Sequence, residues 1–190
     1  MERFKDEWRN LTSITAHYFT CGYCGNKTGT SAGYQTGGAK GFIVICGGCN
    51  RPTFFEQNAN QTPRSRLGND VEHLPAMLEK LYLEARDCTQ VGAFTACVLT
   101  CRKILMHVAV EQGAKENQIF IKYVEYLANS GFVPPNGKGW VDHIRTRGNE
   151  ANHEVVLMSE VQALELLSFT EMLLKFIYEF PARIAPSGIS

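Results

Sequence analysis

The chain has 190 residues, of which 44% are hydrophobic and 20% charged, and its formal net charge at pH 7 is zero. This is an ordinary globular composition, and the even charge balance does not by itself call for a nucleic-acid partner. No apolar run approaches the roughly 18 residues needed to cross a bilayer, and the charged opening Met1–Glu7 is unlike a secretory signal. We therefore expect a soluble cytoplasmic protein with no membrane partner, and seven cysteines fit a reducing compartment.

The first 57 residues carry strand patterns after a short opening. Phe4 and Trp8 lie four residues apart, which predicts a short amphipathic helix over residues 1–10. The stretch 25–41 is rich in Gly, Thr and Ser and predicts a flexible hairpin or a long loop. Alternating or apolar runs predict three short strands, at residues 12–20, 41–45 and 52–55.

Two Cys-x-x-Cys pairs lie within this strand-rich segment, and they predict a metal site. Their members are Cys21, Cys24, Cys46 and Cys49. A gap of 21 residues separates the pairs, just above the usual range of about 15 to 20. The dipeptide Gly47-Gly48 supplies backbone freedom for the second turn. Four sulfurs leave no position for water, which is typical of one structural zinc ion rather than a catalytic one.

Three alternatives to zinc remain at this point. A thioredoxin-like redox motif requires a single Cys-x-x-Cys beside a βαβ unit, a pattern that this sequence lacks. Disulfide bonds suit a secreted chain, and no signal peptide is expected here. An iron–sulfur cluster is also held by cysteines, although the paired spacing favours zinc. The segment is therefore interpreted as an antiparallel zinc ribbon that depends on its metal.

The remainder of the chain changes to a helical period. Helices are predicted around residues 70–88, 91–110, 119–129, 140–151 and 159–180. Ser159 and Gln162 form a capping box for the last helix, and Pro181 is expected to end it. Cysteines outside the paired motifs lie on apolar helical faces, where we expect them to act as small core residues: Cys88, Cys97 and Cys101.

These patterns predict an α+β protein, in which a small antiparallel zinc ribbon precedes an all-α bundle. A polar stretch with a single large apolar residue, Leu67, separates the two parts. The predicted organisation is a ribbon with a short N-terminal helix at 1–57, a linker at 58–69, a helical bundle at 70–184 and a tail at 185–190.

The densest polar cluster lies on the predicted fourth helix, within residues 143–154. Steps of four residues place Arg145, Asn149 and His153 along one stripe, and Arg147 lies on a second stripe. Arginine binds a phosphate through two hydrogen bonds, histidine moves a proton near neutral pH, and asparagine orients either group. The cluster therefore predicts either chemistry on a phosphodiester or a structural network of the arginines with nearby carboxylates.

The same run resembles the signature of an uncharacterised family of HEPN-like helical domains, which is often appended to restriction-type and phage-defence proteins. The resemblance rests on residues 144–154, with support from 82–85, 92–96 and 101–105. It covers Leu74 to Pro181 and none of the ribbon. It implies a helical bundle, a homodimer and, in many members, a metal-independent ribonuclease that uses arginine and histidine.

The sequence departs from the commonest form of that signature at one position. Gly148 stands where an arginine usually precedes the asparagine, here Asn149. Arg147 keeps a five-residue gap to His153 and satisfies the looser motif, whereas Arg145 fits the subfamily pattern with a seven-residue gap. A cleft between two subunits would allow arginine from one chain to act with histidine from the other.

Two functions are therefore expected as alternatives. The first is an RNA- or nucleotide-directed module of a prokaryotic or phage conflict system, with metal-independent endoribonuclease activity. The second is a non-catalytic dimeric adaptor that binds a protein partner and holds zinc for structure alone. Aromatic residues of the ribbon either stack on bases, fill its thin core or dock it on the bundle, and the scarcity of basic residues beside them favours docking: Tyr23, Tyr34, Phe54 and Phe55.

Overall fold

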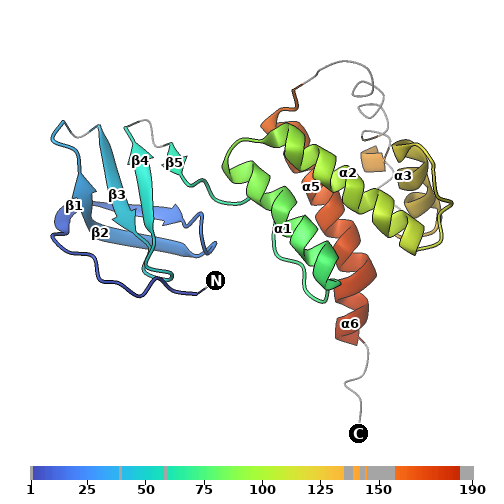
Figure 1. Ribbon diagram of the computed structural model, residues 1–190, viewed down its shortest axis with the longest axis horizontal. Helices are drawn as coiled ribbons and strands as arrows, with labels where there is room; N and C mark the ends of the chain where they lie inside the picture. The colour runs from blue at the N-terminus through green and yellow to red at the C-terminus, as the bar shows by residue number, and fades with distance from the viewer. Residues whose placement is uncertain are drawn as a thin grey trace, which may run out of the picture. The chain divides into compact units, whose positions relative to one another are not determined.

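The computed structural model describes residues 2–38, 40–57, 60–134, 139–141, 144 and 157–184. The chain divides into two compact units, Met1–Arg66 and Leu67–Ser190. The first unit contains an antiparallel sheet and the second is helical (Figure 1), so the predicted α+β fold class is confirmed.

The sheet of the first unit is a meander in which each strand pairs with the next one along the chain. Its strands are β1 (Thr12–Thr20), β2 (Lys27–Gln35), β3 (Gly41–Ile45), β4 (Pro52–Glu56) and β5 (Gln61–Thr62). All neighbouring pairs are antiparallel. The strands predicted at 12–20, 41–45 and 52–55 are confirmed by β1, β3 and β4.

Of the two structures predicted for 25–41, the hairpin agrees with β2, which pairs antiparallel with β1 and β3, whereas the long loop is wrong because β2 occupies Lys27–Gln35. Gly33 shows why the composition misled. A Cβ atom at Gly33 would lie 2.2 Å from the carbonyl oxygen of Ile43, so the backbones approach too closely for any side chain there. Glycine in this strand therefore marks a close backbone approach rather than flexibility.

The core of the first unit is small. Phe19, Val44 and Phe55 are buried together with three of the four paired cysteines. Phe42 lies opposite Phe55 in the sheet, and their rings stack with centroids 5.3 Å apart. The His17 ring meets the Phe55 ring edge-on at 4.2 Å. A core of this size supplies little stabilisation by itself, so we expect the cysteine centre to stabilise the fold.

The short helix predicted over residues 1–10 is absent from the described part of this segment, 2–10. The Phe4 backbone N–H donates to the carbonyl oxygen of Cys49 at 3.0 Å, and the Trp8 indole N–H donates to that of Asn50 at 3.0 Å. The Asn50 side chain donates in turn to the Phe4 carbonyl oxygen at 3.1 Å. These bonds tie the segment to the second cysteine loop, and they replace the internal bonds that a helix would form.

The expected linker over 58–69 is divided between the two units at Arg66. Gln61–Thr62 forms β5 and extends the sheet. Residues 67–69 belong to the helical unit, where the Arg86 guanidinium donates to two of their carbonyl oxygens. The polar composition of this stretch suggested a free connection, but the backbone groups at both of its ends find hydrogen-bond partners.

The second unit is a bundle in which α2 packs against α1, α3 and α5. Its described helices are α1 (Ala76–Gln90), α2 (Phe94–Glu111), α3 (Phe120–Asn129), α5 (Glu160–Leu174) and α6 (Phe180–Ile184). Cys97 and Cys101 are fully buried in its core, as predicted, and Cys88 is half-buried against it. None of the helices in the described part of the chain has the length and apolar character required to cross a bilayer.

The predicted fourth helix is described only at 139–141 and at Ile144, and these residues are helical. The ring of Trp140 meets that of Phe169 edge-on, with centroids 5.6 Å apart. Val141 and Ile144 are buried in the same core. The start of the predicted helix therefore packs on α5, and its remainder lies outside the described residues.

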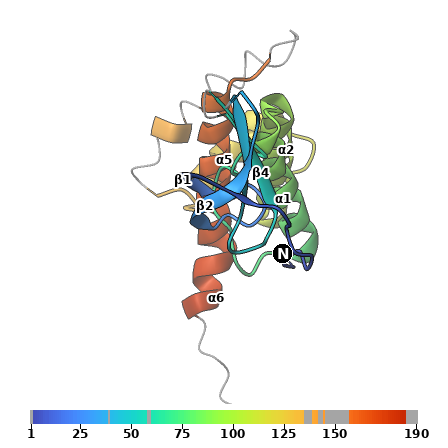
Figure 2. The same ribbon diagram turned by 90° about the vertical axis from the view of Figure 1, so that its left-hand side faces the viewer.

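The last helix begins as predicted and ends later. Ser159 and Gln162 form the capping box. The helical structure does not end at Pro181, because a π-helical turn, η2 (Lys175–Glu179), joins α5 to α6. The Phe180 N–H bonds to the Lys175 carbonyl oxygen five residues earlier, and this wider turn accommodates a proline that lacks an N–H and crowds the preceding turn. Figures 1 and 2 show α6 extending past the end of the bundle where α1 begins.

Acidification is expected to destabilise the helical unit through Glu171. Burial acts to raise the pKa of this carboxyl, but bonds from Lys175 and from the backbone and side chain of Asn69 hold it below its ordinary value of 4.5. A lowered folded-state pKa means that the ionised group stabilises the unit above about pH 4.5, and that this contribution is lost as pH falls through the folded value. Urea unfolding between about pH 6 and pH 3 measures the effect. Glu171→Gln should flatten this dependence, whereas Glu125→Gln, which removes a partly exposed carboxylate of α3, should not.

Candidate metal centre

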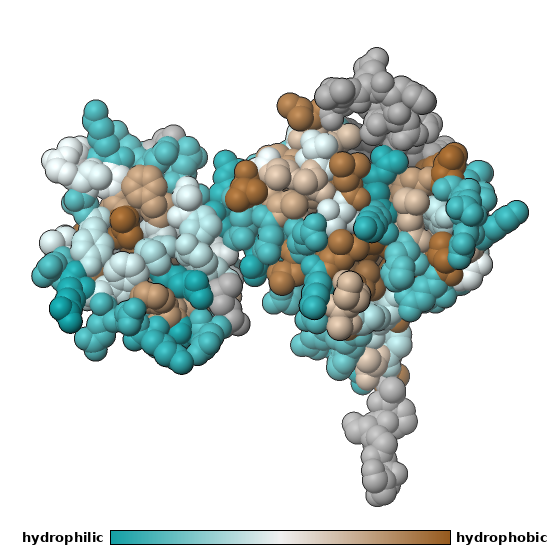
Figure 3. Space-filling view, viewed as in Figure 1, coloured by the Kyte–Doolittle hydropathy of each residue, from teal (hydrophilic) through white to brown (hydrophobic). Residues whose placement is uncertain are grey.

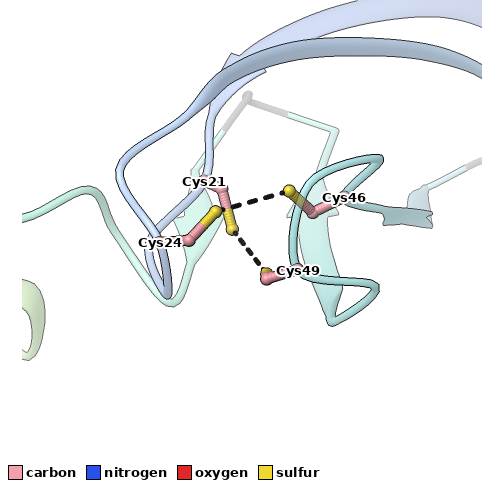
Figure 4. Close-up of side chains that lie close together, drawn as sticks. All are labelled: Cys21, Cys24, Cys46 and Cys49. Atoms are coloured by element: carbon pink, nitrogen blue, oxygen red, sulfur yellow. Dashed lines mark hydrogen bonds between the residues drawn. The ribbon is translucent and has the colours of Figure 1, made fainter. Parts of the chain in front are cut away.

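The four paired cysteines come together between two loops of the sheet. Cys21 and Cys24 lie between β1 and β2, and Cys46 and Cys49 lie between β3 and β4 (Figure 4). Their sulfur atoms all lie within 4.8 Å of one another. The Sγ atoms of Cys21 and Cys49 are 3.7 Å apart, as are those of Cys24 and Cys46. A disulfide requires about 2.05 Å, so the four residues are free thiols in this arrangement.

These distances suit four ligands of one metal ion. Metal–sulfur bonds of about 2.3 Å arranged as a tetrahedron place neighbouring sulfurs about 3.8 Å apart. The two 3.7 Å separations match that edge length. Cys21 and Cys46 are fully buried and Cys49 is nearly so. The structure thus assembles a closed, all-sulfur metal site from the residues that the spacing had predicted.

The two Cys-x-x-Cys loops share a backbone hydrogen bond, and we call residues 21–24 and 46–49 the first and second knuckle. In each, the N–H of the residue after the second cysteine donates to the carbonyl oxygen of the first cysteine at 2.9 Å. These following residues are Gly25 and Asn50, with φ of 72° and 58°. Glycine and asparagine are the residue types that tolerate this left-handed conformation best.

The sequence predicted that Gly47-Gly48 would supply the unusual backbone conformation of the second turn, but that conformation occurs at the residue after each knuckle. Neither glycine has a positive φ, whereas Gly25 and Asn50 do. At Gly48 the requirement is space, because an added Cβ would lie 2.6 Å from the Asn26 side-chain nitrogen. Asn50 was not predicted as part of the centre. Its position after a knuckle, matching that of Gly25, was the signal in the sequence that points to it.

Backbone N–H groups favour the ionised form of the knuckle thiols. Burial raises the pKa of Cys21 to about 12. At Cys46 burial also acts to raise the pKa, but the backbone N–H groups of Cys49 and Gly48 donate to the sulfur and the net shift is downward. Burial disfavours four neighbouring thiolates, so a cation among them is required to hold all four in the ligand form.

Arg51 joins the two knuckles from outside the sulfur cluster. Its backbone N–H donates to the Cys49 sulfur, and its carbonyl oxygen accepts the Cys46 N–H at 3.0 Å. Its guanidinium lies over the Tyr23 ring in the first knuckle, 5.4 Å from the centroid. Four thiolates around a divalent cation leave an excess of negative charge, which this guanidinium offsets. Sequence reasoning missed Arg51, because its partner ring lies 28 residues earlier in the chain.

Gly22→Ala is expected to damage the centre, whereas Gly47→Ala is expected to be tolerated. The two glycines occupy the same place in their knuckles. A Cβ at Gly22 would lie 2.5 Å from the carbonyl oxygens of Pro63 and Arg64, but one at Gly47 would lie 3.5 Å from the Thr28 hydroxyl, an ordinary contact distance. Overpacking against backbone costs about 1–3 kcal/mol. Thermal unfolding and metal retention in the presence of a chelator compare the variants. Equal behaviour of the two would show that the carbonyl oxygens of Pro63 and Arg64 do not restrict the residue at position 22.

Residues 83–188 match a known family, the Domain of unknown function (DUF4145), over more than half of the chain. The chain belongs to this family. The DUF4145 match begins within α1 and takes in every later helix, but it leaves the sheet and the four-cysteine centre outside. No curated protein and no solved structure matches the chain.

The DUF4145 region contains the polar cluster predicted from the sequence. Its members, Arg145, Arg147, Asn149 and His153, all lie outside the described residues. The structure describes both flanks of the cluster. Ile144 is buried in the helical core, and the Met158 N–H donates to the Thr95 hydroxyl on α2 at 3.0 Å. The cluster therefore stays a prediction from the sequence, attached at both ends to described parts of the bundle.

Arg102 is a further polar residue of the DUF4145 region. Its half-buried guanidinium lies over the Phe120 ring at 4.5 Å from the centroid. Desolvation lowers its pKa. Stacking on Phe120 provides a local role for this arginine on a mostly buried helix.

The aromatic residues singled out in the sheet divide between core and surface. Phe55 is buried in the core of the first unit, an alternative that the sequence left open beside the favoured docking on the bundle, and Tyr23 lies beneath Arg51. The Tyr34 hydroxyl donates to the carbonyl oxygen of Arg9. Phe54 is 37% exposed, and its ring covers Gly41. Most of these rings therefore have a structural role within the first unit.

Proposed function

We propose that the four-cysteine centre holds one structural zinc ion per chain. Four clustered cysteine sulfurs, three of them from buried residues, form a donor set that zinc prefers, and no ligand position is left for water or substrate. The ion would fix two loops separated by a gap of 21 residues and so stabilise a unit with a small core. Metal analysis of the purified chain separates zinc from iron, since an iron–thiolate centre absorbs visible light and a zinc centre does not.

We further propose that the DUF4145 domain is an RNA- or nucleotide-directed module of a prokaryotic or phage conflict system, with metal-independent endoribonuclease activity. The observation that carries this proposal is the co-occurrence of arginine, asparagine and histidine in residues 145–153, within the matched family region. The metal centre lies outside that region and is closed, so chemistry in this protein is assigned to the side chains of the cluster.

The proposed reaction uses groups of the RNA and of this chain together with solvent water. The 2′-hydroxyl releases its proton to water as its oxygen attacks phosphorus, the bond from phosphorus to the 5′-oxygen breaks, and a 2′,3′-cyclic phosphate forms. His153 donates the proton to the leaving 5′-oxygen, and Arg145 or Arg147 stabilises the charge on the phosphoryl oxygens. Asn149 orients these groups by hydrogen bonds. In a homodimer, arginine and histidine would come from different subunits.

RNA cleavage by the zinc-loaded chain tests this proposal. Transfer RNA or total RNA is incubated with the protein in buffer freed of divalent metal, beside His153→Ala and His107→Ala, the latter removing a histidine of α2 outside the cluster. We expect cleavage by the native chain and by His107→Ala, and a loss of at least about a hundredfold in His153→Ala. Cleavage that survives in His153→Ala, or that requires added divalent metal, would contradict the mechanism.

A dimeric adaptor is a second candidate, and exposed apolar side chains favour it. Figure 3 shows hydrophobic residues at the surface of the helical unit. They include Met77, Leu83, Val91 and Leu99, which belong to or adjoin α1 and α2. Solvent-exposed apolar side chains are a common feature of protein-binding surfaces. Sedimentation of native chain and Leu99→Lys tests self-association through this surface. A monomer at every concentration would oppose the homodimer, and absence of RNA cleavage by a dimer would favour the adaptor.

A further inference from the structure

Tyr18 is the most exposed large hydrophobic side chain of the sheet, at 84%. It lies on β1 between His17 and Phe19, whose rings both point into the aromatic core and contact Phe55. Successive side chains of a strand point to opposite faces. Tyr18 therefore lies on the outer face of the β1–β2 hairpin, away from the core and the stabilising contacts of the first unit.

The Tyr18 ring is held in place by the strand beside it. Tyr18 pairs with Gly29 across the β1–β2 ladder. A Cβ at Gly29 would come within 2.6 Å of Cδ1 and 2.7 Å of Cε1 of the tyrosine, so the ring covers the glycine backbone. Gly29 has no positive φ that would require glycine. Its lack of a side chain thus leaves the space in which the ring lies, with the opposite side of the ring open to solvent.

A lysine accompanies this exposed ring. The next cross-strand pair on the same face joins Thr20 to Lys27, two residues along each strand. Tyr18, Thr20, Lys27 and Gly29 all line one shallow depression of about 500 Å³. Lys27 is exposed, and it is the only charged residue of that lining. The depression therefore combines an open aromatic ring, a hydroxyl and a positive charge.

The net charge of the first unit favours an anionic ligand, since it stays positive after the excess negative charge of a zinc–thiolate centre is counted. Residues 1–66 contain eight Lys/Arg against four Asp/Glu. Three of those acids lie in the first seven residues, so Glu56 is the only acidic residue between Leu11 and Arg66. A ligand that combines flat aromatic groups with regularly spaced negative charges matches both the ring and the lysine. Single-stranded nucleic acid is such a ligand, because its bases stack on exposed aromatic side chains and its phosphates pair with nearby cations.

We propose that Tyr18 and Lys27 form a binding site for single-stranded nucleic acid on the outer face of the β1–β2 hairpin. A base stacks on the free side of the Tyr18 ring, and a neighbouring phosphate pairs with Lys27. Binding at this site is separate from the chemistry proposed for the DUF4145 domain. It would place a strand on the protein whether or not the helical unit cleaves RNA.

Fluorescence anisotropy with labelled single-stranded oligouridine and oligodeoxythymidine tests the site in the full zinc-loaded chain. The DNA probe lacks the 2′-hydroxyl and is immune to the proposed cleavage, so binding is measured independently of catalysis. Tyr18→Phe keeps the ring and should bind within about twofold of the native chain. Tyr18→Leu keeps an apolar side chain without a π face, and it should weaken binding between about fivefold and a hundredfold.

Two further variants test the position of the Tyr18 ring and the charge of Lys27. Gly29→Ala retains Tyr18 but introduces a Cβ where the ring lies, so it should weaken binding as Tyr18→Leu does. Lys27→Gln should reduce the slope of log affinity against log salt by about 0.7, the contribution of one phosphate contact to single-stranded binding. Phe54→Leu, at the partly exposed ring over Gly41, is the matched control and should leave affinity unchanged.

The outcomes that oppose the site are equally specific. Unchanged affinity in both Tyr18→Leu and Gly29→Ala, with zinc content and unfolding temperature preserved, would remove Tyr18 from the interaction. Equal affinity for duplex and single-stranded probes would exclude base stacking. Absence of binding at low salt would overturn the proposal, and it would leave His153-dependent cleavage to be judged by its own assay. Preference for RNA or for DNA identifies which single strand the site takes.

Discussion

Cys46→Ser is expected to release the metal and unfold the first unit, while the helical unit stays folded. The buried core of residues 1–66 holds only a few large side chains beside the cysteines. Structural zinc contributes about 10–16 kcal/mol of apparent folding free energy in small domains at neutral pH. Loss of one of four ligands opens the tetrahedron and leaves three thiols, two of them buried, without a shared cation. Most of the stability of this unit should therefore disappear with Cys46.

Zinc content and two-dimensional NMR spectra of the full chain measure this outcome. Amides of residues 12–62 should lose their dispersion in Cys46→Ser, whereas those of α2 and α5 should keep theirs. Cys88→Ser changes a half-buried cysteine on α1 and serves as the control, because it should retain one zinc per chain. A Cys46→Ser protein that keeps both its zinc and its dispersed sheet resonances would show that the metal is dispensable.

The cysteine centre could be predicted from the sequence because the residues of each ligand pair lie close together in the chain. Each knuckle is a short turn, and two such turns with suitable spacing leave few arrangements other than a shared metal. The supporting residues could not be predicted in that way. Arg51 and Asn50 act through Tyr23 and Phe4, which are distant in the chain and are brought close only by folding. Tertiary partners of this kind leave no periodic signal.

The wrong predictions about secondary structure have a related origin. Phe4 and Trp8 show helical spacing, but the knuckle offers their segment backbone partners that compete with helix formation. The composition of β2 suggested flexibility, although its glycines, Gly29 and Gly33, instead make room for a tyrosine ring and for a neighbouring carbonyl. Pro181 should have ended a helix, and a π turn accommodates it. In each case the surrounding structure overrode a correct local preference.

The buried Arg86 gives the second large expected effect, a loss of about 2–4 kcal/mol of helical-unit stability in Arg86→Met. Its side chain is nearly inaccessible, and it donates to the carbonyl oxygens of Leu67 at 3.1 Å and Gly68 at 3.0 Å. It also pairs with Asp70. Methionine keeps an apolar stem of similar length but leaves two carbonyl oxygens without their donors. Urea unfolding of the helical transition measures the change.

The geometry also predicts which of these partners matters. The Asp70 side chain is 90% exposed, so water screens its charge and solvates it when the pair is broken. Asp70→Asn should therefore cost less than about 1 kcal/mol, well below Arg86→Met. Equal losses in the two variants would show that the ion pair, and not the carbonyl bonds, holds this segment. Gly68 has φ of 71°, and an added Cβ there would lie 3.3 Å from Tyr82 on α1 and from Leu167 and Glu171 on α5. Arg86 therefore fixes a backbone segment that passes between these two helices.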